Sequence, residues 1–397
     1  MWQPMTLSQL AQFLANGLDS RGGLTQRSHV QAAAHLLKMK QAPYIIPEID
    51  FQLKDALLVG VDMEWHESNP HIVTELGISV LRLPQTMLGK PIHALNDMEV
   101  HHLRLKENAH WVNGEKCEGH PEDFQFGTTC FVDGTQAKQA LSDTFKRYDT
   151  RGNLRPIILF GHAVGNDIDT LREQFDFDLA ALGVIVLTLD TQVMAREVGL
   201  SSGNMSLKNI LGQYSVREKY LHNAGNDIAQ TMVAASLLAG ESVIGRGRYQ
   251  PENQVDVDNL KAVLRNRSIL YWGISVFCTN CDSTQHFVGQ CPRTYLCTRC
   301  ANNPSWKQNA NTHPIEKCIR PASPCKACAK STDATRQNDA MTHYIVDCPF
   351  EKAPTLFFVP RAFLPLEKCL QEQFKEIAKR SSDNESGLRE MLDDSDE

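Results

Sequence analysis

The 397-residue sequence has no apolar run long enough to cross a bilayer as a helix, so we expect no membrane partner. Its beginning, MWQPMTLSQLAQFLANGL, lacks a basic segment followed by an apolar core. We therefore expect no secretory signal and a cytoplasmic location, with the nucleus as a further compartment. A strong positive charge is also absent, since the formal net charge is −7, and the most basic stretch has only a modest excess of Lys and Arg, unlike a histone-like surface.

The negative charge is concentrated at one end of the chain. Residues 381–397 contain seven acidic residues and one Arg, and without them the chain is close to neutral. We expect this acidic segment to be disordered. Residues 268–361 are modestly basic, with ten Lys and Arg against six Asp and Glu.

The length of 397 residues is enough for two or more domains, and a composition with 42% hydrophobic and 22% charged residues is typical of a soluble globular protein. From Phe51 to Gly240, apolar runs and helical patterns alternate, which predicts an α/β fold. The expected strands are 57–64, 73–83, 99–105, 157–161 and 184–188, and the expected helices are 136–148, 167–175, 206–214 and 226–239.

The same patterns predict how the chain is divided. The expected segments are a helical N-terminal part at 1–50, the α/β domain at 51–240, a linker at 241–267, a cysteine-rich region at 268–350, a docking helix within 351–380 and the acidic tail.

Two acidic residues lie in an otherwise apolar stretch, LLVGVDMEW, at residues 57–65. Because side chains alternate across a strand, Asp62 and Glu64 project from one face and Met63 from the other. Two buried carboxylates repel each other unless a cation lies between them, and Mg²⁺ prefers oxygen ligands of this kind. The alternative is an edge strand with a solvated face, which a D-x-E motif alone does not exclude.

Other residues strengthen the case for a metal site. IILFGHAVGNDIDTL reads as a strand, a turn and a helix, with Asp167 on the first helical turn. HNAGNDIAQTMVAASLLAG puts Asp227 at the start of another helix, five residues after His222. Each Asp alone fits a helix cap equally well. The nearest competing acids are Asp169 and Asp190, and we expect Asp190 to cap a helix.

The order of these motifs over roughly residues 51–240 resembles the DEDDh group of 3′–5′ exonucleases. The resemblance implies a ribonuclease-H-like mixed sheet flanked by helices, and hydrolysis of phosphodiester bonds in single-stranded nucleic acid. It implies that His222 is the general base that activates water. It also implies that four acids hold two Mg²⁺ or Mn²⁺ ions, namely Asp62, Glu64, Asp167 and Asp227.

Finer stretches, EVHHLRLKENAHWVNG and HPEDFQFG, resemble a fungal branch of these nucleases that includes the QIP-type exonucleases of RNA silencing. This resemblance implies RNA as the substrate, such as small RNAs or passenger strands, and an Argonaute protein as a partner. Many relatives have Thr-Gly soon after the Glu, whereas Trp65 and His66 follow here. Met63 or Trp65 is a candidate for stacking on a base, with core or rim packing as the alternative.

Twelve cysteines in a chain without a secretory signal favour metal ligation over disulfides, and nine of them lie between residues 278 and 348. They form three sets that share the spacing C-x2-C and then H-x4-C, each suited to one tetrahedral Zn²⁺. The first set is Cys278, Cys281, His286 and Cys291; the second set is Cys297, Cys300, His313 and Cys318; the third set is Cys325, Cys328, His343 and Cys348.

The three sets resemble CCHC knuckles, which implies binding of single-stranded nucleic acid through aromatic and basic side chains. Phe287 and Tyr344 follow two of the histidines. Knuckles that bind nucleic acid often have an aromatic residue directly after the first Cys and Gly before the His. The first set instead has Thr279 and Gln285 at these two positions. Protein–protein contact or structural support is the alternative, and the spacing also leaves sharing of ligands between sets open.

For the whole protein, the first hypothesis is a metal-dependent exonuclease with a nucleic-acid-holding zinc region. The second is a catalytically inactive scaffold or adaptor that binds nucleic acid through the zinc sets. Loss of one of the five catalytic positions would favour the scaffold, and none is missing. Cys117, Cys130 and Cys369 fall outside the sets and are expected to be packed thiols.

Overall fold

The computed structural model describes residues 5–16, 29–39, 47–67, 69–84, 90–114, 117–244, 252–302, 307, 310–318 and 326–339. Four predictions lie outside these ranges: most of the third set, the docking helix within 351–380, the packed thiol of Cys369 and the acidic tail. Among the described helices, none has the length and apolar character needed to cross a lipid bilayer.

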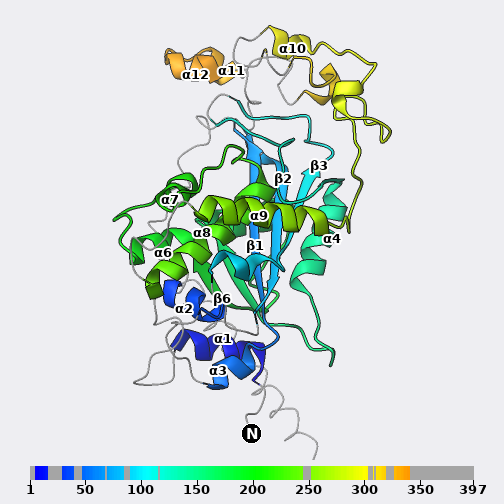
Figure 1. Cartoon of the computed structure of the whole chain (residues 1–397). Coiled ribbons are helices and arrows are strands. Elements are labelled where there is room, and N and C mark those ends of the chain that lie inside the picture. The colour runs from blue at the N-terminus through cyan, green and yellow to red at the C-terminus, as the bar shows by residue number, and fades with distance from the viewer. Residues whose placement is uncertain are drawn as a thin grey trace, which may run out of the picture. The chain divides into compact units, whose positions relative to one another are not determined.

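A six-stranded mixed sheet forms the centre of the described chain (Figure 1). Its order is β4-β3-β2-β1-β5-β6. Strand β2 is antiparallel to both β1 and β3, whereas the pairs β1–β5, β3–β4 and β5–β6 are parallel. This is a mixed sheet flanked by helices, as the sequence predicted. The strands are β1 (Leu57–His66), β2 (Asn69–Arg82), β3 (Glu99–Leu105), β4 (Thr129–Val132), β5 (Ile157–Gly161) and β6 (Ile185–Asp190).

Helices cover both faces of the sheet. On one face, α8 packs across the middle strands, where it buries side chains such as Ile228 against Leu58 and Ile158. On the other face, α4 and α5 enclose Val59, Val61 and their neighbours. The helices are α1 (Leu7–Asn16), α2 (His29–Leu36), α3 (Pro47–Gln52), η2 (Ile92–Leu95), α4 (Gly134–Phe145), α5 (Gly165–Phe175), α6 (Thr191–Glu197), α7 (Leu207–Gln213), α8 (Ala224–Ile244), α9 (Glu252–Arg267), η3 (Val288–Gln290), α10 (Thr298–Ala301), η5 (Ile315–Lys317), α11 (Lys326–Ala329) and α12 (Ala334–Asp339).

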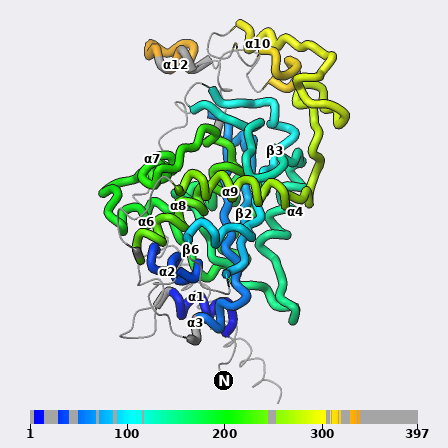
Figure 2. Tube along the Cα trace, viewed as in Figure 1, coloured from blue at the N-terminus to red at the C-terminus, as the bar shows by residue number. Residues whose placement is uncertain are grey.

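The N-terminal helices share the core of the sheet. Apolar side chains of α1 and α2 belong to the same buried cluster as those of α8 and β6, and both helices contact β6 (Figure 2). The first turn of α2 is held by Glu197, whose carboxylate accepts hydrogen bonds from the backbone N–H groups of His29 (2.8 Å) and Val30 (2.9 Å). A carboxylate at this end of a helix also interacts favourably with its dipole.

The prediction of a linker over residues 241–267 is wrong for most of that segment. Residues 252–267 form α9, which buries Val257, Leu260 and Leu264 in the core beside α8. These three side chains follow helical spacing, so they lie on one face. Between them the helix is strongly polar, which is why its sequence reads as a linker.

A close approach between α8 and the sheet brings the start of α8 beside β1. A Cβ atom built on Gly77 of β2 would lie 2.0 Å from the Ala224 carbonyl oxygen, and one built on Gly225 would lie 2.6 Å from the His102 Cβ. Gly77 is the cross-strand partner of Asp62. Only glycine permits this backbone contact, and it sets the distance between the first turn of α8 and the D-x-E motif.

We predict that Gly77→Ala destabilises the fold, because the added methyl group must push α8 away from β2. Overpacking of this kind typically costs about 1–3 kcal/mol. Gly212→Ala is the matched control: Gly212 lies near the end of α7 with open space around it, so Ala there should be neutral or raise the free energy of unfolding. Thermal unfolding measures both, and equal Tm values for the two variants would contradict the close-approach argument.

Candidate functional site: an acidic metal centre

Four acidic side chains meet where β1 and β5 end. Asp62 and Glu64 project from β1 toward the start of α8, and Asp227 lies in the first turn of that helix. Asp167, in the first turn of α5, accepts a hydrogen bond from the backbone N–H of Met63. The structure thus brings the four predicted acids together within range of mutual repulsion.

The electrostatics of this cluster favour bound cations. Burial, with the nearby charges of Asp167 and Asp227, raises the pKa of Asp62 well above its ordinary value, and the pKa of Glu64 shifts in the same direction, mainly through burial. Burial raises the pKa of Asp167 and that of Asp227 to about 8. At neutral pH these acids must either hold protons or be neutralised by positive charge.

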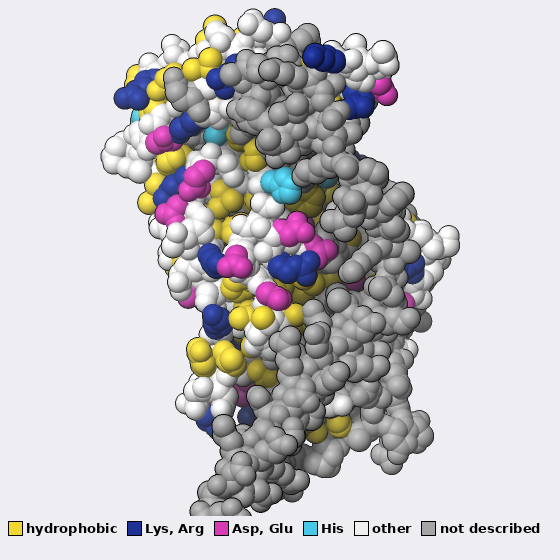
Figure 3. Space-filling model, turned by 180° about the vertical axis from the view of Figure 1, so that it is seen from behind, with side chains coloured by type: hydrophobic (Ala, Val, Ile, Leu, Met, Phe, Trp, Pro, Cys, Tyr) yellow, Lys and Arg dark blue, Asp and Glu magenta, His cyan; other side chains and the backbone are white. Residues whose placement is uncertain are grey.

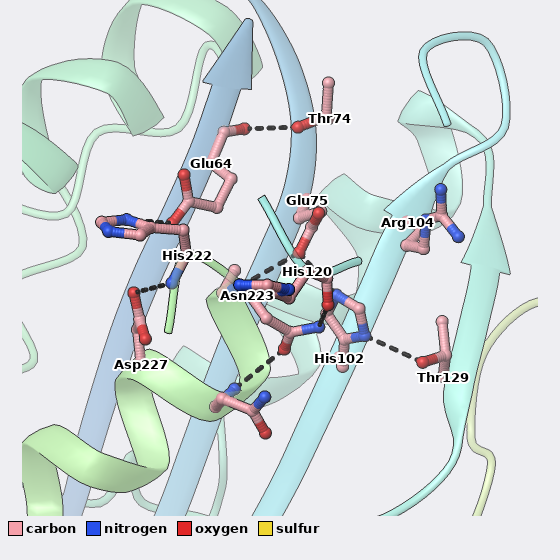
Figure 4. Close-up of polar contacts among 12 residues, drawn as sticks. Glu64, Thr74, Glu75, His102, Arg104, His120, Thr129, His222, Asn223 and Asp227 are labelled. Carbon is pink, nitrogen blue, oxygen red and sulfur yellow. Dashed lines mark hydrogen bonds and ion pairs between the residues drawn. The ribbon is translucent and has the colours of Figure 1, made fainter. Parts of the chain in front are cut away.

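His222 completes the site. Figure 4 shows its ring beside Glu64, with the Nδ1 atom 3.9 Å from Glu64 Oε1. Its backbone N–H donates to Asp227 Oδ2 at 3.0 Å, and its φ of +62° is the left-handed conformation. The side chain is half exposed, and burial lowers its pKa, with contributions from His120 and Lys208. The imidazole is therefore neutral at physiological pH and accessible to solvent.

The donor set fits divalent metal ions. The ligand atoms of Glu64, His222 and Asp227 all lie within 4.8 Å of one another. Among the described residues, the buried oxygens Asp62 Oδ2 and Asp227 Oδ1 have no hydrogen-bond partner. Buried polar atoms are nearly always satisfied, and unpaired carboxylate oxygens grouped in this way match the ligand preference of Mg²⁺ and Mn²⁺.

Behind the acids lies a buried pair that the sequence reading missed. Glu75 Oε2 accepts hydrogen bonds from the Ala224 backbone N–H (3.1 Å) and from the His102 ring Nε2 (2.8 Å), while His102 Nδ1 lies 2.9 Å from Thr129 Oγ1 (Figure 4). Glu75 therefore ties the start of α8 to β2 opposite Glu64. Its signal was an acid inside the apolar run HIVTELGISV.

A second set of contacts fixes the loop before α8. The His222 carbonyl accepts from the His120 backbone N–H (3.1 Å), and the Asn223 side chain donates to the His120 carbonyl (2.9 Å). The Asn226 side chain donates to the carbonyls of Asp123 and Tyr220. The stretches HPEDFQFG and HNAGND thus form one unit that holds His222 over the acids.

The competing acids lie outside the site. Asp190 caps α6, as predicted, by accepting from the Gln192 backbone N–H at 2.7 Å. Asp169 is exposed and forms an ion pair with Arg172 at 2.6 Å. Met63 is buried in the core on the α4 and α5 side, and Trp65 is partly buried against that core. Met63 therefore packs in the core and is not available to stack on a base. Trp65 retains some exposed surface, so it is the remaining candidate of the two.

Two of the three cysteine sets assemble as predicted. In each of the first and second sets, the four ligand atoms lie within 4.8 Å of one another, and neither set borrows a ligand from the other. In the second set, the hydrogen bond with the Cys318 thiol and burial raise the pKa of Cys300. Crowded thiols of this kind ionise readily only with a cation between them, which fits Zn²⁺. The third set lies mostly outside the described residues. Cys130 is a packed thiol, as predicted.

The surface beyond the site has mixed charge. On the face in Figure 3, the described residues present acidic and basic side chains interspersed with apolar ones.

Sequence comparison agrees with this geometry. Residues 57–238 match the family model described as DNA polymerase III subunit epsilon-like, C-terminal domain, of the DEDDh type. The match supports a DEDDh-type nuclease domain, and such nucleases use divalent metals. Over 178 residues the chain is 29% identical to an uncharacterized nucleolar protein of Schizosaccharomyces pombe. That alignment covers 44% of this chain and 65% of the relative, so the chain spans slightly less than two thirds of its length.

Comparison with solved structures finds E. coli exonuclease I. A zinc-bound complex of that enzyme with single-stranded DNA is 12% identical, with a TM-score of 0.31, and the match covers 50% of this chain and 42% of the enzyme. A complex with a dA16 oligonucleotide gives 11% identity and a TM-score of 0.30, with the same coverage. Similarity this remote says nothing about substrate or mechanism.

The raised carboxyl pKa values predict an unusual pH dependence of stability. A carboxyl whose folded pKa lies above its unfolded pKa stabilises the fold below the unfolded value, and this contribution is lost as pH rises through the folded value. For Asp227 this window runs from about 4 to about 8. We expect Asp227→Asn to raise the Tm of the metal-free protein at pH 8 but not at pH 4.

Asp169→Asn is the matched control, because Asp169 is exposed and ion-paired outside the site, and its Tm difference from wild type should not grow with pH. A stabilisation of about 1 kcal/mol moves Tm by roughly 2–4 °C in a domain of 150–250 residues. Added Mg²⁺ should raise the Tm of wild type more than that of Asp227→Asn. Equal Mg²⁺ shifts would contradict the assignment of Asp227 as a ligand.

Proposed function

We propose that this protein is a metal-dependent 3′–5′ exonuclease that hydrolyses phosphodiester bonds in single-stranded nucleic acid. The observation that carries the proposal is the convergence of Glu64, His222 and Asp227, with their ligand atoms within 4.8 Å, beside the buried carboxyl groups of Asp62 and Asp167. These are the five positions named by the sequence motifs. The match of residues 57–238 to a DEDDh family model supports the same reaction class.

In this proposal the four acids would hold two Mg²⁺ or Mn²⁺ ions, which would supply Lewis-acid stabilisation of the attacking and leaving oxygens. The chain's own residues prepare that chemistry. The buried carboxyl groups concentrate negative charge where cations must bind, and Glu75 and Gly77 fix α8 at the distance that brings Asp227 to Asp62.

His222 is the proton acceptor in this scheme. Its lowered pKa keeps the ring neutral, and its half-exposed position lets water approach. The hydrogen bond from its own backbone N–H to Asp227 couples the ring's position to a metal ligand. A neutral imidazole beside the metal ligands can take the proton of an attacking water.

The finer identity of the substrate and partner is part of the proposal. The resemblance to the fungal branch supports RNA, and with it a role in RNA silencing beside an Argonaute protein. The nucleolar relative supports a location in the nucleus. In the first cysteine set, Phe287 directly follows the ligand His286, is 45% exposed and has exposed Val288 beside it. We propose that this zinc module stacks on bases of the substrate strand.

The test is a 5′-labelled single-stranded oligonucleotide, supplied as matched RNA and DNA and incubated with Mg²⁺ or with EDTA. We expect a ladder that shortens from the 3′ end in Mg²⁺ alone, and faster cleavage of RNA. His222→Ala removes the proton acceptor and should lower the rate by roughly 10²–10⁴-fold, and Asp62→Asn should lower it at least as far. Gel electrophoresis of timed samples measures each rate.

Asp169→Asn serves again as the control, since Asp169 sits two residues from Asp167 but points away from the site; it should retain the wild-type rate. Shortening in EDTA, or immediate release of the label as a mononucleotide, would be incompatible with this proposal. Binding of the oligonucleotide without any shortening would instead favour the inactive scaffold.

A further inference from the structure

The second cysteine set (Cys297, Cys300, His313 and Cys318) is packed into the nuclease domain. All four of its ligand residues are buried, whereas in the first set only Cys278 is. Three of the second set's cysteines share a buried cluster with Trp111, with Ile72 of β2 packed against it. A zinc module joined to the domain only by a flexible linker would keep its ligands near the surface. The burial of the second set therefore indicates a different structural role from that of the first set.

Trp111 connects this set to the end of β1. It is 2% exposed, and its ring centroid lies 4.6 Å from that of the ligand His313 and 5.2 Å from that of His66. His66 is the last residue of β1, two positions after Glu64, and is itself 2% exposed. A continuous row of packed rings therefore runs from a zinc ligand to the strand that carries the D-x-E motif.

The loop that contains Trp111 also holds the backbone of β1 directly. The Asn113 side chain donates to the Trp65 carbonyl (2.8 Å) and accepts from the Glu67 backbone N–H (2.9 Å). In the same loop, Asn108 donates to the Val73 carbonyl of β2 (2.8 Å). Side chains from one loop thus tie together the ends of both strands.

This loop matters because the sheet is irregular at that point. The pairing of β1 with β2 shifts register between Glu64 and Trp65 and again between Trp65 and His66. A register shift interrupts the ladder and re-aims the neighbouring side chains. Beyond Glu64 the strand therefore depends on Asn113 and on the packing of His66 against Trp111.

We infer that zinc in the second set is a structural part of the nuclease site: by fixing His313 against Trp111, it sets the loop that holds the end of β1 and so the position of Glu64. This inference rests on the proposed function for its catalytic consequence. Trp111 and Asn113 are positioning residues, because Asn113 bonds the backbone of Trp65 and Glu67 and Trp111 packs on His66. Without the zinc ion, the three cysteines and His313 lose the shared metal that holds them together beside Trp111.

The experiment compares equivalent cysteines of two sets in the full-length chain. Cys281→Ser and Cys300→Ser each replace the second Cys of a C-x2-C pair, and each should lower the zinc content by one ion per chain. We expect Cys300→Ser to weaken Mn²⁺ binding at the acidic site roughly 10-fold or more, the usual effect of losing a supporting contact around metal ligands, and to slow hydrolysis. Cys281→Ser should leave Mn²⁺ affinity unchanged. Elemental analysis and Mn²⁺ titration followed by electron paramagnetic resonance give the readouts.

Asn113→Ala tests the link without touching a zinc ligand, in case Cys300→Ser does not fold. It should keep the wild-type zinc content and circular dichroism spectrum and still weaken Mn²⁺ binding. Unchanged Mn²⁺ affinity in Asn113→Ala, or in a folded Cys300→Ser that has lost zinc, overturns the inference. A wild-type protein that binds Mn²⁺ but cleaves no oligonucleotide refutes the proposed function alone, because the two Mn²⁺ comparisons still decide the zinc link.

Discussion

The repulsion among four carboxyl groups at the ends of β1 and β5 is the constraint on which the rest of the site depends. Burial makes each negative charge costly, and close neighbours add to that cost, so these carboxyl groups hold protons at neutral pH unless a cation neutralises them. The acidic cluster destabilises the folded state, and packing and hydrogen bonds elsewhere in the fold must compensate for it. Binding sites often carry such local instability, because a group that is fully satisfied within the protein has little left to offer a ligand.

The fold supplies that support through backbone contacts made by small or buried polar side chains. Gly77 and Gly225 let the start of α8 touch the sheet, and Glu75 then accepts the first N–H of the helix. Asn223 and Asn226 bond the loop before α8 to residues 120–125, which holds His222 in a left-handed backbone conformation. These residues are not among the proposed metal ligands, but each restricts the position of the side chains that are.

The sequence predicted most strongly what is encoded locally. Asp62 and Glu64 share a face because strand alternation has a period of two, and the first and second sets assemble because their spacing is short. Glu75 and His102 were missed because their partner, the start of α8, lies about 120–150 residues further along the chain. The four-residue β4 is too short to leave a pattern, and α9 hides its few apolar side chains among polar ones. The packing of His313 on Trp111 joins segments about 200 residues apart, and spacing carries no information about it.

The anchoring of α2 has a practical consequence for biochemistry on this protein. Glu197 holds the first turn of α2, and the apolar side of that helix lies in the same core as α8 and β6. A recombinant fragment trimmed to the family-model limits, 57–238, would therefore lack α1, α2 and α9, whose apolar side chains form part of its hydrophobic core. Such a fragment would expose hydrophobic surface and tend to self-associate. Loss of activity in that fragment would then reflect aggregation and would not show that the site is inactive.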